Sequence, residues 1–150
     1  MDSLTIVRAP RWNRLQLARD VTYKLRNQKA RTGLTPNLLC RLGFVLSLTE
    51  PQIPDPATYD QEGQELNRTT LLGEWDEAFE ALLRQRIADD GLDLVDDFLP
   101  QLRAHMNRGA ELICGRVRDI ADLAALIPSD GPVDDVPGAP AISEASHGRR

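Results

Sequence analysis

Apolar residues recur at helical spacing along most of the chain. The clearest stripe lies in residues 71–88, where Leu71, Trp75, Phe79 and Leu82 follow one another at intervals of three and four residues. Such a stripe is the buried side of an amphipathic helix, and Thr70 is placed to cap its start.

The same spacing appears elsewhere, whereas strand-like alternation is confined to one place. Helices are predicted over 20–32 and 36–48, with a short helical turn over 92–99 and a last long helix from 100 that continues or restarts up to 126. Polar and apolar residues alternate at Arg14–Leu17, which fits a short strand or an extended lead-in. We therefore expect an all-α fold that starts with at most one short strand.

Local chemistry predicts several helix ends. Asp20 is a candidate N-cap for the first helix, and Gly33 suits the left-handed position after its end. Thr35-Pro36 combines a hydroxyl N-cap with proline at the first helical position. Residues 51–68 contain several prolines and polar side chains, and they predict a long polar connection.

Three regions are expected along the chain. Residues 1–13 show little periodicity and predict a flexible N-terminal arm that contains Arg8, Arg11 and Trp12. Residues 14–127 form the helical domain, and residues 128–150, rich in proline, small and charged side chains, predict a disordered tail.

The helix predicted over residues 36–48 is apolar on nearly every side. Its apolar residues are Leu38, Leu39, Leu42, Phe44, Val45, Leu46 and Leu48. Such a helix is buried in a core or in a subunit interface, so we expect a homo-oligomer.

The sequence lacks the motifs of nucleotide-binding, metal-binding and membrane proteins. Neither a Walker-type nor a dinucleotide-binding glycine loop occurs, so no cofactor is expected. Cys40, Cys114, His105 and His147 are too scattered to predict a metal site. No apolar run approaches a membrane span and no signal peptide is evident, so we expect a cytoplasmic protein.

Charge is distributed very unevenly. The formal net charge of −5 is made up of +6 in residues 1–50, −10 in residues 51–100 and −1 in the last fifty. A basic segment of this kind is typical of proteins that bind nucleic acid, although solvated helix faces would also explain it.

The basic segment supplies the candidate DNA-binding residues, which surround the helix predicted over 20–32. They are Arg14, Arg19, Lys24, Arg26, Lys29 and Arg31. On a helix these side chains cover a broad face, which suits contact with DNA phosphates. Few polar residues alternate on the predicted strand, so weak sequence specificity is expected.

A strand followed by two helices is also the outline of a ribbon-helix-helix DNA-binding protein. A transcriptional regulator or antitoxin of that class is therefore an alternative, and it would discriminate a defined operator from random DNA.

Several ordered motifs resemble the DNA sulfur modification protein DndE family, over about residues 14–126. They are Arg31-Thr32-Gly33-Leu34-Thr35-Pro36-Asn37-Leu38-Leu39, Ile53-Pro54-Asp55-Pro56, Gly63-Gln64-Glu65-Leu66-Asn67-Arg68, Thr70-Leu71-Leu72-Gly73-Glu74, Leu82-Leu83-Arg84-Gln85-Arg86 and Arg103-Ala104-His105-Met106-Asn107-Arg108-Gly109.

The resemblance implies a helical, DNA-binding, oligomeric and non-catalytic subunit of the bacterial machinery that replaces a phosphate oxygen of DNA by sulfur. It further implies a preference for nicked duplex, and as partners an SMC-like ATPase and a sulfur-transfer protein with an iron–sulfur cluster. A second alternative is a metal-dependent nickase that uses Glu65 and Asn67. We favour instead a structural role, in which Asn67-Arg68 and Asn107-Arg108 tie the long connection to the last helix.

Overall fold

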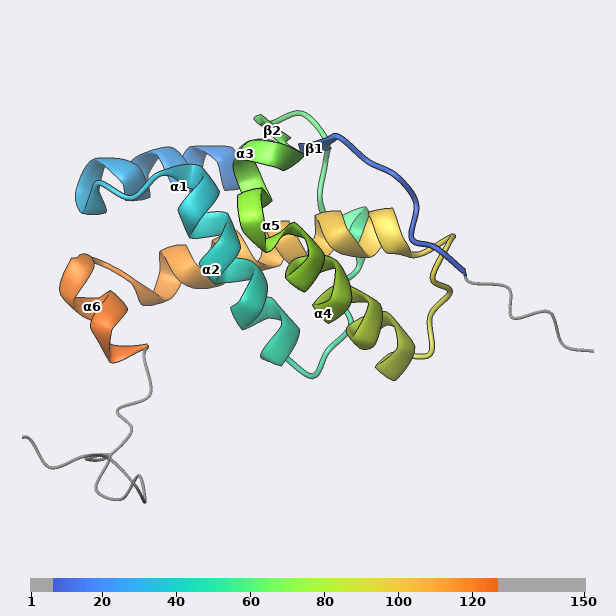
Figure 1. Ribbon diagram of the computed structural model, residues 1–150. Coiled ribbons are helices and arrows are strands. Elements are labelled where there is room, and N and C mark those ends of the chain that lie inside the picture. Colours follow the sequence, from blue (N-terminus) through green and yellow to red (C-terminus); the bar gives the residue numbers. More distant parts are fainter. Residues whose placement is uncertain (1–6, 127–150) are drawn as a thin grey trace, which may run out of the picture.

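The computed structural model describes residues 7–126, which form a mostly helical domain (Figure 1). In chain order its elements are β1 (Arg14–Gln16), α1 (Arg19–Thr32), α2 (Pro36–Thr49), the 3₁₀ turn η1 (Pro56–Thr58), β2 (Glu65–Asn67), α3 (Arg68–Leu72), the 3₁₀ turn η2 (Gly73–Trp75), α4 (Asp76–Asp89), α5 (Phe98–Arg116) and α6 (Ile120–Ala125). The predicted all-α class with a short initial strand is confirmed. The predicted tail, 128–150, and the first six residues of the arm lie outside the described residues.

The core is organised around α5. Figure 1 shows α5 running across the back of the molecule, with α2 and α4 crossing in front of it. Gly43 on α2 and Gly109 on α5 meet at the first of these crossings, where a Cβ atom on either residue would overlap the backbone carbonyl of the other. The glycines therefore set how closely the two helices approach. The largest fully buried side chains of the core include Leu25, Leu39, Phe44, Leu83, Phe98, Met106 and Ile113.

The predicted initial strand is present, but its partner was missed. β1 pairs antiparallel with β2, with Leu15 opposite Leu66, and β2 lies inside the segment predicted as a polar connection. Only Leu66 of β2 is buried, so three residues carry too little pattern to predict a strand. The strand–helix–helix order is confirmed, and its strand pairs within the same chain.

The helix predicted over residues 71–88 is interrupted. α3 ends at Leu72, and Gly73 adopts a positive φ of 53° before α4 begins at Asp76. The guanidinium of Arg41 donates to the carbonyls of Thr70 and Leu71, which a continuous helix would use internally. Arg41 is about thirty residues away in sequence, so the apolar stripe alone predicted one helix where two are found.

Part of the predicted flexible arm belongs to the folded domain. Trp12 is only 8% exposed and packs in the core, with the Arg68 guanidinium 4.9 Å from its ring centroid. The Arg68 N–H also donates to the Asn13 carbonyl at 2.8 Å. The boundary predicted after Asn13 therefore falls too late, because a single tryptophan has no periodicity to reveal its burial.

Candidate nucleic-acid interface

The start of α1 is held by side chains from two distant segments. Asn107 on α5 is fully buried, and its Oδ1 accepts a hydrogen bond from the Ala18 N–H at 2.9 Å. Asp60, in the loop before β2, accepts one from the Arg19 N–H at 3.0 Å. The prediction that Asp20 caps this helix was wrong: Ala18 is the N-cap residue and Asp20 lies in the first turn. The groups that satisfy these N–H donors lie far away in sequence.

The Asp60 carboxylate complements the positive end of α1. Hydrogen bonds from the backbone N–H groups of Arg19 and Glu62 lower the pKa of Asp60 below its ordinary value. The charged form is favoured because it accepts these bonds next to the helix N-terminus.

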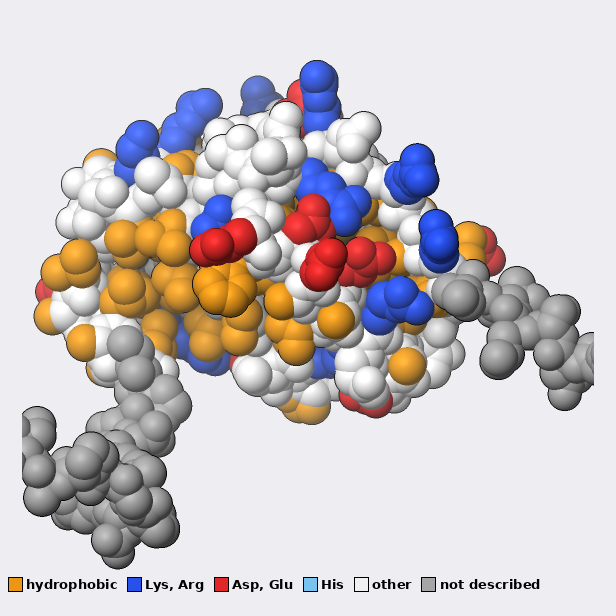
Figure 2. Space-filling model, viewed as in Figure 1, with side chains coloured by type: hydrophobic (Ala, Val, Ile, Leu, Met, Phe, Trp, Pro, Cys, Tyr) orange, Lys and Arg blue, Asp and Glu red, His pale blue; other side chains and the backbone are white. Residues whose placement is uncertain are grey.

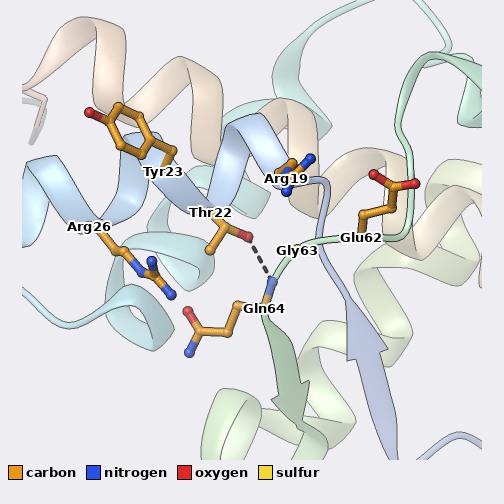
Figure 3. A pocket seen from close by; sticks show the side chains of 7 residues that line it. All are labelled: Arg19, Thr22, Tyr23, Arg26, Glu62, Gly63 and Gln64. Atoms are coloured by element: carbon orange, nitrogen blue, oxygen red, sulfur yellow. Dashed lines mark hydrogen bonds between the residues drawn. The ribbon is translucent and has the colours of Figure 1, made fainter.

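The loop that carries Asp60 packs tightly on the first turn of α1. Thr22 Oγ1 donates to the Ala18 carbonyl at 2.9 Å and accepts from the Gln64 N–H at 2.8 Å (Figure 3). A Cβ atom on Gly63 would overlap both Thr22 Oγ1 and the Ala18 carbonyl, so glycine is required at that position. This close approach explains the Gly63-Gln64 motif by packing.

One side of α1 is buried and the other faces solvent. Val21, Thr22, Leu25 and Gln28 are buried, and the Gln28 amide donates to the Val117 carbonyl after α5. Gly33 ends the helix with φ 73°, and its N–H donates to the Lys29 carbonyl, as predicted for a left-handed cap. The helix is therefore fixed at both ends, with its other side exposed.

The solvent side carries the candidate cations in two rows. Arg19 and Arg26 lie next to the 62–64 loop, whereas Lys24 and Arg31 lie next to Glu111 and Cys114 of α5. Lys29 is exposed one turn beyond Arg26. The sixth predicted residue, Arg14, lies on β1 beyond the start of α1. The structure thus brings five of the six predicted residues onto one helix.

Two of the six predicted cations are already paired with carboxylates. Arg14 lies 3.6 Å from Glu65, and Lys24 Nζ lies 3.7 Å from Glu111 Oε1. Arg19, Arg26, Lys29 and Arg31 form no ion pair with any residue between 7 and 126. Of the six predicted residues, these four are the most available to an anionic ligand. The Lys24–Glu111 pair could not be predicted from the sequence, because it joins two distant helices.

Arg19 and Arg26 flank a shallow hollow between α1 and the loop before β2. Figure 3 shows the Arg26 side chain directed toward that of Gln64, with Tyr23 pointing away from the loop. Two guanidinium groups and an amide supply several N–H donors to this hollow. Such donors suit the oxygens of a phosphate group.

The two Asn–Arg pairs bind other segments of the chain. Asn67 caps α3 by accepting from the Thr69 N–H, and Arg68 makes a two-pronged ion pair with Asp76 at 2.7 and 2.8 Å. Arg108 donates to Ser47 Oγ at 2.8 Å and to the Gln52 carbonyl at 2.6 Å. Arg108 therefore ties α5 to the start of the long connection, as predicted, whereas Asn67 and Arg68 contact α3, α4 and the N-terminal arm and not the last helix. Glu65, the other residue of the nickase hypothesis, forms an ion pair with Arg14.

His105 lies in the core. Its Nδ1 is 2.8 Å from Ser47 Oγ, and the residue has no exposed surface. Burial, helped by the positive charges of Arg108 and Arg86, lowers the pKa of His105 to about 3. The side chain is therefore neutral at physiological pH and forms part of the packing of α2 on α5.

The cysteines and acidic residues do not gather into a metal site in residues 7–126. Cys40 is fully buried, and burial raises the pKa of its thiol to about 12. No helix in this part of the chain is long and apolar enough to cross a membrane.

An apolar surface remains exposed on α2. Leu39, Cys40, Gly43 and Phe44 face the core, whereas Leu38 and Val45 are 37% and 45% exposed. Figure 2 shows a hydrophobic area over α2 that continues toward α6. One side of α2 is therefore buried in the core of the domain, and its other side, although also apolar, is exposed.

The fold and the surface described above define a small, mostly helical domain that presents an exposed basic helix. Comparison with known proteins then identifies the family. The family model described as DNA sulphur modification protein DndE matches residues 14–119, and the chain belongs to this family. No curated protein matches.

Two solved structures of the family resemble this one. The crystal structure of DndE from Escherichia coli B7A, involved in DNA phosphorothioation modification, is 27% identical, with a TM-score of 0.57. The structure of a DndE G21/24K mutant involved in DNA phosphorothioation is 26% identical, with a TM-score of 0.55. Each match covers 71% of this chain and 99% of the other.

Proposed function

We propose that this chain is a non-catalytic DNA-binding subunit of the DNA phosphorothioation machinery, which holds duplex DNA by its phosphates through the exposed side of α1. One observation carries the proposal: Arg19, Arg26, Lys29 and Arg31 lie along one anchored helix without a carboxylate partner in residues 7–126. Membership of the DndE family supports the modification system as the setting.

The chemistry of these side chains favours phosphate over base contact. Lysine and arginine on a convex helix reach phosphate oxygens readily, and such contacts give affinity without sequence information. β1, the only strand among residues 7–50, pairs with β2 of the same chain. Binding therefore depends on the charge and shape of the duplex, including a nicked one, and the protein acts in the cytoplasm with the DNA.

We further propose that the protein assembles with copies of itself and with other phosphorothioation proteins. The exposed apolar surface around Leu38 and Val45 is the surface we assign to self-association, since water contact with it is unfavourable. An SMC-like ATPase and a sulfur-transfer protein with an iron–sulfur cluster are the proposed partners, and they would supply the catalysis.

Fluorescence anisotropy with a labelled random duplex tests the DNA contact. The double variant Arg26→Ala with Lys29→Ala removes two unpaired charges from α1 and lowers the net charge by two. The matched control is Ala78→Glu with Leu82→Glu, which makes the same change in net charge at exposed positions of α4.

The proposal predicts that the α1 variant binds at least several-fold more weakly than the control at about 0.1 M salt, where charges beyond about 10 Å are screened. Equal affinities of the two variants would remove α1 as the DNA-contacting surface.

A further inference from the structure

Residues 7–13 precede the segment shared with the DndE family, yet they are fixed to the domain at both ends. At one end, Arg84 Nη2 donates to the Val7 carbonyl at 3.2 Å. At the other end, Arg68 stacks on the Trp12 ring and donates to the Trp12 carbonyl at 3.2 Å. Ala9 packs against the core between these anchors. Residues 7–13 are therefore packed against the domain, although the match to the family model begins only at residue 14.

Two arginines on this segment are turned to solvent. Arg8 and Arg11 are exposed, and neither forms an ion pair with a described residue. Arg68, by contrast, is enclosed by Asp76 and Glu80 at 2.7 and 3.8 Å. Arg68 and Arg84 thus hold the segment in place, and Arg8 and Arg11 remain available to a ligand.

The arm and α1 extend from β1 in opposite directions. Figure 1 shows α1 on one side of the β1–β2 ribbon and the N-terminal segment on the other. Figure 2 shows Lys and Arg side chains following the same upper edge of the molecule, over α1, past the ribbon and along the arm. The basic side of α1 and the arm therefore form one elongated edge.

We infer that Arg8 and Arg11 form a second phosphate-contacting region, which extends the DNA path from α1 across β1 onto the N-terminal arm. This inference rests on the proposed DNA-binding function. The 14 residues of α1 are about 21 Å long, which matches about six base pairs. Seven extended residues add at most about 25 Å, so the whole edge spans about 13 base pairs.

The test compares three variants of the full chain by the salt dependence of duplex binding. They are Arg8→Ala with Arg11→Ala, Arg26→Ala with Lys29→Ala, and the control Ala78→Glu with Leu82→Glu, whose positions lie away from Arg84 on α4. Trp12 is retained in all three, so its packing is unchanged. The slope of log K against log salt is about −0.9 per neutralised phosphate, so the arm variant should bind with a slope less steep by about 1.8 than the wild type.

The outcomes separate this inference from the proposed function. A normal slope in the arm variant together with a reduced slope in the α1 variant overturns the arm contact and leaves α1 as the DNA surface. An arm variant no different from the control also overturns it, because net charge would then account for the change. Absence of duplex binding by the wild-type protein overturns both proposals.

Discussion

Lys24 on α1 is paired with Glu111 on α5, with Nζ and Oε1 3.7 Å apart. Both side chains are partly exposed, so the pair contributes little to folding and is free to be replaced. A DNA phosphate that approaches α1 must compete with Glu111 for Lys24. The Glu111 carboxylate therefore lowers the affinity of the proposed DNA surface, although α5, which carries it, holds none of the predicted DNA contacts.

Removing this carboxylate should strengthen DNA binding. Glu111→Gln frees Lys24 and deletes one negative charge, so duplex affinity should rise about two- to fivefold, the equivalent of an exposed ion pair of up to about 1 kcal/mol. Anisotropy at constant salt measures the change. Glu77→Gln, at an exposed position on α4, is the control and should leave the affinity unchanged. Weaker binding by Glu111→Gln would mean that the pair positions α1 for DNA.

The crossing of α2 and α5 should not tolerate a methyl group. Gly43→Ala or Gly109→Ala places a Cβ atom against backbone of the facing helix, which can yield only if the helices separate. Overpacking of this kind should cost about 1–3 kcal/mol of unfolding free energy. Urea unfolding followed by circular dichroism measures the loss.

Gly115 provides the control for the helix crossing. It lies on the same helix as Gly109, and a Cβ atom there would meet no atom within 4 Å. Gly115→Ala should stabilise the protein by up to about 1 kcal/mol through its higher helix propensity. A loss of stability at Gly115 equal to that at Gly109 would show that the close approach is not the cause.

Burial of His105 should make the protein less stable in mild acid. The pKa of His105 is lowered to about 3, so the native state keeps it neutral while the unfolded chain takes up a proton below about 6.5. The contribution of neutral His105 to the free energy of unfolding is therefore fully present above about pH 6.5. It decreases as the pH falls, by about 2 kcal/mol at pH 5. Urea unfolding at pH 7.5 and pH 5 measures it. His105→Gln should lose this part of the pH dependence, and an unchanged difference in that variant would assign it to other groups.

The exposed apolar side of α2 should control self-association. Leu38→Glu with Val45→Glu places charges on that surface without touching the buried residues of the helix. Sedimentation velocity should show a smaller species than the wild type, with unchanged helical content. Leu82→Glu, on the exposed part of α4, is the matched substitution at another apolar position. If only Leu82→Glu altered the assembly, self-association would belong to α4.

Local chemistry in the sequence predicts some elements closely. Thr35 accepts from the Leu38 N–H and Pro36 begins α2, as their types and order indicate. Features that depend on distant residues were missed. β2 exists because Leu66 lies opposite Leu15, and the break at Gly73 is supported by Arg41 from α2.

The candidate DNA-binding site also has features that local sequence predicts and features that depend on distant residues. The 3.6-residue repeat is enough to place Lys24, Arg26, Lys29 and Arg31 around the exposed side of one helix. The pairing of Lys24 with Glu111, 87 residues later in the chain, depends on how α1 packs against α5. The place of the arm depends similarly on Arg68, which meets Trp12 only after folding.

The salt dependence of wild-type duplex binding tests the central claim most directly. Association constants for two random duplexes of different sequence are measured by anisotropy between about 0.05 and 0.3 M salt. Contacts from Arg19, Arg26, Lys29 and Arg31 predict the same slope for both duplexes, about −3.6 for one subunit and steeper for an oligomer on one duplex. A slope near zero, or affinities for the two sequences that differ by several kcal/mol, would contradict phosphate binding by α1.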